Sequence, residues 1–155
     1  MTGVQTCALP ILRIEGPRGE FVLKEESQRP LIFVACETGF APVKSLIEHA
    51  MALDAAESLH LYWVAPDGGH YLDNLCRSWS DALDDFRYRP LKTSGAAHSE
   101  ETVERVLQQV KQDHPRLGDC DVYLAGSEAF TTAFEYELLE GGLPRGQLFV
   151  SSLEN

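Results

Sequence analysis

The sequence has no closely spaced cysteine pair, no long hydrophobic run and no excess of basic residues. Four cysteines are widely separated along the chain: Cys7, Cys36, Cys76 and Cys120. Their spacing argues against a zinc site or an iron–sulfur cluster, and it favours reduced thiols over a disulfide framework. No segment is long and apolar enough for a transmembrane helix, and residues 1–11 lack the basic start of a signal peptide. We therefore expect a cytoplasmic protein that binds neither a metal nor a membrane.

Acidic residues outnumber basic ones by 24 to 13, which gives a formal net charge of -11 at pH 7. A surface of this sign disfavours nucleic acid and anionic membranes as partners. It still allows an anionic ligand at a local site, because the overall charge is screened over about 8–10 Å in physiological salt. No G-x-S-x-G or H-E-x-x-H motif supports hydrolase chemistry. Of the scattered histidines, we expect His49 and His114 on helix surfaces and His60 within a strand.

Apolar runs alternate with segments of helical periodicity from residue 31 to the end of the chain. The apolar runs predict strands at residues 31–36, 59–64, 86–91, 122–125 and 147–150. The periodic segments predict helices at residues 42–54, at 72–83, from Ser99 onward and at 128–140. Short connections imply parallel strands with right-handed crossovers. The sequence therefore predicts an α/β fold: a doubly wound, mainly parallel five-stranded sheet with helices on both faces. A short β remnant is expected before it, at residues 12–14 and 21–23.

The stretch at residues 31–42 joins an apolar strand to a helix through a short Thr-Gly turn. A helix start offers unpaired N–H groups and the positive end of the helix dipole, which together favour an anion. Gly39 allows close approach of the backbone to a ligand, and Pro42 suits a first helical turn, where its missing N–H costs nothing. Thr38, Gly39 and Pro42 are therefore candidates for binding a nucleotide pyrophosphate. An ordinary strand–helix turn is the alternative, because the G-x-G-x-x-G fingerprint is absent.

A second loop of small residues, Gly126 and Ser127, follows the predicted strand at residues 122–125 and precedes a helix. Ligands of doubly wound sheets bind beyond the carboxyl ends of the strands, where the strand order reverses. If the strands at residues 31–36 and 122–125 are neighbours, the two loops face each other across that crevice. Gly126 and Ser127 therefore join the candidate nucleotide-binding residues.

Three segments resemble motifs of the ferredoxin–NADP reductase superfamily, whose members are flavin-dependent electron-transfer enzymes. Residues 16–21, Gly-Pro-Arg-Gly-Glu-Phe, are similar to the G-P-x-G-x-F segment at the end of the family's flavin barrel. Residues 38–42, Thr-Gly-Phe-Ala-Pro, match its T-G-x-x-P loop. Residues 122–127, Val-Tyr-Leu-Ala-Gly-Ser, take the place of its V-Y-x-C-G-P segment. The three segments occur in the family's order, and the resemblance covers residues 12–153.

This resemblance implies the NAD(P)H-binding domain of an oxygenase-reductase type of flavoprotein, with the flavin domain largely missing. It makes residues 1–11 a leader of uncertain origin, residues 12–29 the end of the flavin domain with its linker, and residues 30–155 the NAD(P)H-binding domain. In such proteins hydride passes from nicotinamide to the FAD of the full-length parent, and electrons pass on to an acceptor protein. The chain alone would be inactive or weakly active. The alternative is a non-catalytic nucleotide-binding or protein-interaction domain on the same fold.

The sequence departs from the family's motifs at three positions: Glu37 replaces a glycine, Ala125 a cysteine and Ser127 a proline. Glu37 adds negative charge beside the expected pyrophosphate site. The cysteine that Ala125 replaces normally lies near the nicotinamide, so no residue receives a catalytic assignment here. Cys36, at a strand end near a helix start, has two interpretations: a thiol of lowered pKa, or a small buried residue.

Asp67 bears on the choice between NADH and NADPH. A 2′-phosphate requires a basic residue nearby, and the segment after the predicted strand at residues 59–64 has no Arg or Lys before Arg77. A carboxylate at Asp67 would repel that phosphate and could accept a hydrogen bond from a ribose hydroxyl. We therefore expect NADH as the cofactor, with NADPH disfavoured. The alternative is that Asp67 is only a turn residue.

Overall fold

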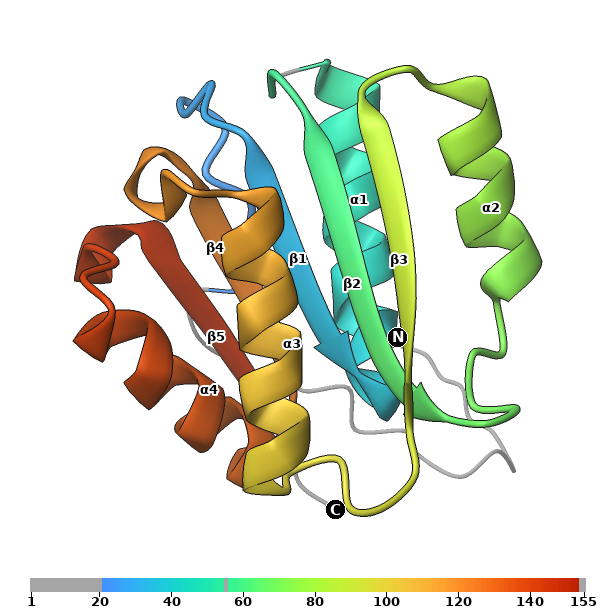
Figure 1. Ribbon diagram of the computed structural model, residues 1–155. Helices are drawn as coiled ribbons and strands as arrows, with labels where there is room; N and C mark the ends of the chain where they lie inside the picture. Colours follow the sequence, from blue (N-terminus) through green and yellow to red (C-terminus); the bar gives the residue numbers. More distant parts are fainter. Residues whose placement is uncertain (1–20, 55, 154–155) are drawn as a thin grey trace, which may run out of the picture.

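The computed structural model describes residues 21–54 and 56–153 (Figure 1). The strands within these ranges are β1 (Leu31–Cys36), β2 (Leu59–Pro66), β3 (Phe86–Thr93), β4 (Asp121–Ser127) and β5 (Leu148–Leu153). The α-helices are α1 (Phe40–Leu53), α2 (Asp73–Ala82), α3 (Glu100–Asp113) and α4 (Glu128–Glu140). Short 3₁₀ helices are η1 (Glu37–Gly39), η2 (Leu117–Asp119) and η3 (Arg145–Gln147). No helix in the described ranges has the length and apolarity needed to cross a membrane.

The strands form one sheet in the order β3-β2-β1-β4-β5, and every neighbouring pair is parallel. Helices α1 and α2 cover one face, and α3 and α4 cover the other (Figure 1). The doubly wound sheet predicted from the sequence is therefore confirmed. The strand order reverses between β1 and β4, where Ala35 pairs with Ala125. The prediction that Gly126 and Ser127 form a loop is wrong, because they are the last residues of β4 and pair with Ser152 and Leu153 of β5. They nevertheless lie at the same edge of the sheet as the turn that follows β1.

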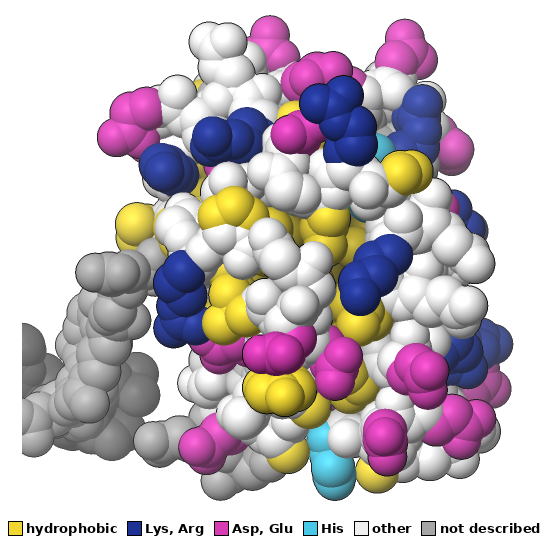
Figure 2. Space-filling view, turned by 60° about the vertical axis from the view of Figure 1, so that its left-hand side comes forward, with side chains coloured by type: hydrophobic (Ala, Val, Ile, Leu, Met, Phe, Trp, Pro, Cys, Tyr) yellow, Lys and Arg dark blue, Asp and Glu magenta, His cyan; other side chains and the backbone are white. Residues whose placement is uncertain are grey.

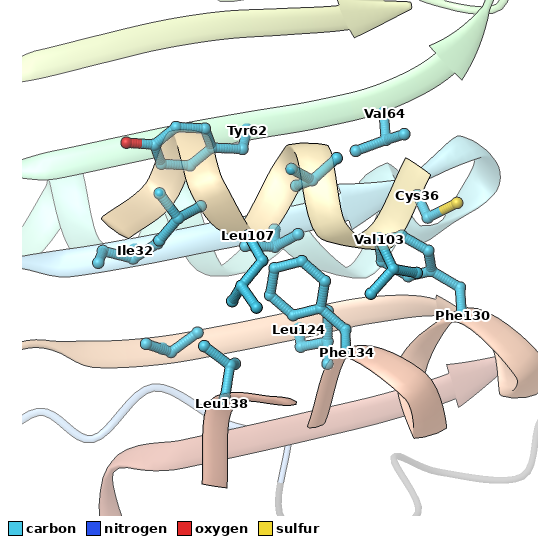
Figure 3. Close-up of a cluster of buried hydrophobic side chains, with 14 of the residues drawn as sticks. Ile32, Cys36, Tyr62, Val64, Val103, Leu107, Leu124, Phe130, Phe134 and Leu138 are labelled. Atoms are coloured by element: carbon cyan, nitrogen blue, oxygen red, sulfur yellow. The ribbon is translucent and has the colours of Figure 1, made fainter. Parts of the chain in front are cut away.

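Strand β1 lies at the centre of the sheet and is buried on both faces. All six of its residues are at most 2% exposed, as expected for a strand of a parallel sheet that reads as one apolar run. Ile32, Val34 and Cys36 pack with α3 and α4, while its other residues pack with α1. On the first of these faces, Phe130 and Phe134 of α4 stack at 5.5 Å between ring centroids (Figure 3). This burial on both sides fixes the position at which β1 ends.

The strand predicted at residues 21–23 is not formed, and the one predicted at residues 12–14 lies outside the described residues. The short apolar run at residues 21–23 packs against a sheet face instead. Leu23 is buried, Val22 is exposed, and the Phe21 ring meets the edge of Tyr123 at 6.0 Å between centroids. The backbone N–H of Lys24 donates to the Tyr123 hydroxyl at 2.9 Å. The segment is therefore held by side chains of the sheet rather than by strand pairing.

His60 and His114 form a half-buried pair beneath the end of α3. Their rings meet edge to face at 4.3 Å between centroids, and the Tyr62 hydroxyl lies 3.0 Å from His114 Nε2. The Tyr62 hydroxyl in turn donates to Asp113 Oδ2 at 2.8 Å. His60 is a strand residue as predicted, but the expectation that His114 lies on a helix surface is wrong. It follows α3 and turns inward, because the helix ends one residue earlier, at Asp113.

The pKa of His60 is lowered to about 4, mainly by burial and also by the neighbouring His114 and Arg87, while Asp113 acts in the opposite direction. The pKa of His114 is also lowered, mainly by burial. Because each ring binds a proton more readily in the unfolded chain, acidification favours unfolding. Neutral His60 contributes its full stabilisation above a pH of about 6.5, which is the pKa of the residue in the unfolded chain. This contribution is lost as the pH falls toward the folded-state pKa of about 4.

We predict that unfolding in urea will require about 1–2 kcal/mol less free energy at pH 5 than at pH 7.5 because of His60. The substitution His60→Gln should remove most of this pH dependence. His98 is exposed, so His98→Gln serves as a control and should keep the wild-type dependence. An unchanged pH dependence in His60→Gln would contradict this interpretation.

Candidate functional site

The η1 turn after β1 is in direct backbone contact with the end of β4. A Cβ atom placed on Gly39 would lie 2.2 Å from the carbonyl oxygen of Ala125 and 2.9 Å from the Gly126 nitrogen. A Cβ atom on Gly126 would lie 2.8 Å from Cys36 Cβ. Both glycines are buried, while Thr38 is exposed beside Gly39. The structure therefore brings together the two small-residue segments that the sequence singled out.

Helix α1 begins at Phe40, directly after η1, so Pro42 lies in its first turn as predicted. Neither η1 nor α1 has a side-chain acceptor for its first N–H groups. By contrast, Ser127 accepts a hydrogen bond from the N–H of Phe130 at 3.4 Å and so caps α4. The start of the η1–α1 segment therefore leaves backbone donors and the positive end of a helix dipole at the carboxyl edge of the sheet.

An aromatic group supports the loop after β1 from the side of β2. The Trp63 indole N–H donates to the carbonyl of Glu37 at 3.1 Å, and the Phe40 ring stacks on Trp63 at 3.9 Å between centroids. His70 Nε2 donates to the Trp63 carbonyl at 2.8 Å. Tyr71 meets Trp63 edge to face and is 55% exposed at the same edge. The sequence analysis did not identify Trp63 as a residue of this site. It could have been found from the parallel strand register, which places Trp63 beside Ala35, one residue before the end of β1.

Asp67 lies in the turn after β2, where its contact is with the neighbouring strand β3. Its Oδ1 atom accepts a hydrogen bond from Lys92 Nζ of β3 at 2.6 Å, and both side chains are exposed. This ion pair lowers the pKa of the Asp67 carboxyl. The segment between β2 and Arg77 contains no Arg or Lys, as the sequence indicated. The expectation that Asp67 has no basic neighbour is nevertheless wrong, because the sheet places Lys92 of β3 beside it. The parallel register of β2 and β3, which pairs Ala65 with Lys92, accounts for this contact.

Cys36 is a buried thiol rather than a reactive thiolate. Burial, reinforced by the negative charge of Glu37, raises the pKa of Cys36 to about 12. A helix start can lower a thiol pKa, but here Cys36 is 2% exposed and its side chain packs against Gly126. The interpretation of Cys36 as a thiol of lowered pKa is therefore wrong.

A shallow groove of about 980 Å³ lies at the opposite, amino-terminal edge of the sheet. Arg29, Glu57 and Asp119 are among its lining residues, so that charges of both signs alternate around it. None of the predicted site residues lines this groove. In the described part of the chain, no group of three or more His, Cys, Asp or Glu side chains is arranged to hold a metal ion. The functional candidates therefore remain at the carboxyl edge.

A parallel doubly wound sheet with uncapped helix donors and two small-residue segments at its switch point defines an α/β nucleotide-binding domain. Residues 33–135 match the family model of the oxidoreductase NAD-binding domain. The chain belongs to this family, and its similar proteins are reductases of the ferredoxin–NADP reductase type.

Two curated relatives illustrate the similarity. The chain is 32% identical over 139 residues to a CDP-6-deoxy-L-threo-D-glycero-4-hexulose-3-dehydrase reductase of Yersinia pestis, an alignment that covers 90% of this chain and 42% of the relative. It is 32% identical over 116 residues to an NAD(P)H-flavin reductase of Vibrio harveyi, covering 74% of this chain and 49% of the relative. The chain thus spans less than half the length of these relatives.

Solved structures share the fold at low identity. The Amycolatopsis cytochrome P450 reductase GcoB superposes with a TM-score of 0.73 at 17% identity, covering 88% of this chain and 42% of that one. A ferredoxin NADP+ reductase from Neisseria gonorrhoeae with bound FAD and NADP gives a TM-score of 0.65 at 15% identity, covering 86% of this chain and 60% of that one.

We predict that Gly39→Ala will destabilise the protein by about 2–4 kcal/mol, because the new methyl group would overlap the Ala125 carbonyl in a packed backbone contact. The control is Gly95→Ala, whose Cβ atom would have no neighbour within 4 Å. This control should change the free energy of unfolding by less than about 0.5 kcal/mol. Urea denaturation measures both. Equal effects of the two substitutions would contradict the close approach of the two segments.

Proposed function

We propose that this chain binds a nicotinamide dinucleotide as one domain of a flavin-dependent reductase. In the full-length parent, FAD would accept hydride from the nicotinamide and a protein acceptor would receive the electrons. The observation that carries the proposal is the contact of Gly39 with the Ala125–Gly126 backbone at the switch point of the sheet. The family match and the names of the reductase relatives support the same chemistry.

The pyrophosphate would bind to the backbone donors at the start of the η1–α1 segment, with Thr38 and Gly39 beside it. The nicotinamide would lie nearer Gly126 and Ser127. This ligand is anionic, and on the face seen in Figure 2 acidic side chains predominate at the lower end, toward the carboxyl ends of the strands. Short-range hydrogen bonds from N–H groups must therefore outweigh the repulsion of screened charges.

The remaining parts of the proposal concern the rest of the protein. We propose that residues 12–29 are the end of an upstream flavin-binding domain with its linker, that residues 30–155 are the nucleotide-binding domain, and that residues 1–11 belong to neither. We also propose a cytoplasmic location. It is supported by three cysteines that are free and buried in the described residues: Cys36, Cys76 and Cys120.

Binding of NADH tests the proposal directly. We expect the 155-residue chain to change the fluorescence of added NADH in a saturable manner, and to reduce added flavin or dye slowly or not at all. Binding without turnover is expected because the chain's own fold supplies the nucleotide site, whereas FAD would be held by the upstream domain. No saturable binding of NADH or NADPH would contradict the proposed function.

Within this proposal, NADH is the preferred dinucleotide. Asp67 lies at the carboxyl end of β2, where a doubly wound fold places the adenosine ribose. Its carboxylate would accept a hydrogen bond from a ribose hydroxyl and repel a 2′-phosphate. The paired Lys92 neutralises part of this repulsion, so the preference depends on the balance between the two side chains.

We predict that Asp67→Asn will raise the affinity for NADPH relative to NADH by roughly three- to tenfold, because it removes a repulsive charge and releases Lys92 toward the phosphate. Titration calorimetry with both dinucleotides measures this ratio. In the double variant with Lys92→Ala, most of the gain should disappear. A selectivity that does not change in Asp67→Asn would show that Asp67 is only a turn residue.

A further inference from the structure

Glu37 adopts a backbone conformation that favours glycine. Its φ is 53°, and Asp54, with a φ of 49°, is the only other non-glycine residue with positive φ in the described part of the chain. Asp54 is the C-cap of α1, where a left-handed residue is usual. Glu37 has no such role, because it opens η1 directly after β1. A residue with a side chain that is held in this conformation beside the proposed nucleotide site is the starting point for a functional hypothesis.

The structure holds the Glu37 backbone firmly while leaving its side chain exposed. The Trp63 indole N–H donates to the Glu37 carbonyl at 3.1 Å, and Phe40 stacks on the face of that indole. None of the ion pairs formed among the described residues includes the Glu37 carboxylate. Its charge nevertheless acts on its surroundings, since it contributes to the raised pKa of Cys36. The Glu37 backbone is therefore held directly after Cys36, whose Cβ atom and carbonyl lie against Gly126. The Glu37 carboxylate is exposed at this carboxyl edge of the sheet.

Two parts of a nicotinamide dinucleotide would respond to this charge. The pyrophosphate carries the same negative charge in NADH and in NAD+, so repulsion by Glu37 weakens both forms alike. The nicotinamide ring is neutral in NADH. It becomes a positively charged pyridinium when hydride leaves C4 with its two electrons and reduces the flavin. A nearby carboxylate therefore favours the oxidised ring over the reduced one.

We propose that Glu37 is a specificity-determining residue that biases the site toward the oxidised dinucleotide. This inference rests on the proposed function and deepens it. The bias favours the state in which the ring has given up its hydride. The effect is a difference between two affinities, so a purely structural role of Glu37 would not produce it.

The test measures dissociation constants of NADH and NAD+ for the complete chain, by titration at low ionic strength. We expect Glu37→Gln to lower the dissociation constant of both forms. NADH should gain more, so that the preference for NAD+ over NADH falls roughly three- to tenfold. Glu37→Asp keeps the charge and should keep most of the wild-type preference. Glu140→Gln removes the same charge from the far end of α4 and should leave the preference unchanged.

A preference for NAD+ that Glu37→Gln does not change, in a chain that binds both forms, would overturn the inference and leave the proposed function standing. Failure of the wild-type chain to bind either form would instead contradict the proposed function itself. High salt should reduce the difference between wild type and Glu37→Gln, because the interaction is a screened charge effect.

Discussion

The close approach of two backbones is the constraint on which the site depends. Gly39 lies against Ala125 and Gly126 at a separation that leaves no room for a Cβ atom. That contact requires β1 to end at a fixed height beside β4, and burial of β1 on both faces provides this. The hydrophobic core, the switch point and the positions of the two segments are therefore consequences of one packing arrangement. A larger side chain at Gly39 would separate the segments and so change the crevice between them.

The site combines a local preference for anions with an acidic surrounding. The chain has a formal charge of -11, and Glu37 adds a negative charge at the start of the η1–α1 segment. Oriented N–H groups act over hydrogen-bond distances, whereas surface charges beyond about 8–10 Å are screened by salt. Affinity would then come from the backbone, and discrimination between dinucleotides from the few charged side chains at the edge. Glu37 and the Asp67–Lys92 pair are the described side chains to which we assign that discrimination.

The sequence predicted the elements with strong periodicity and failed where tertiary context decides. The buried run of β1 and the apolar faces of α1 and α3 determine their own structure, so their positions could be predicted. The segment at residues 21–23 is a short apolar run like a strand, but its partner is the side chain of Tyr123. The pairing of Asp67 with Lys92 depends on strand register, and the raised pKa of Cys36 depends on burial, so neither could be read from the residues nearby in sequence.

The most direct test is to titrate NADH into the isotopically labelled chain and follow the backbone amide resonances. We expect saturable shifts concentrated in residues 38–40, at the η1–α1 junction, and in residues 126–130, at the β4–α4 junction, because these segments meet at the switch point. The residues of the amino-terminal groove, such as Gln28 and His114, should not shift. Saturable binding that shifts the groove residues, while both segments stay unchanged, would contradict the assignment of the site.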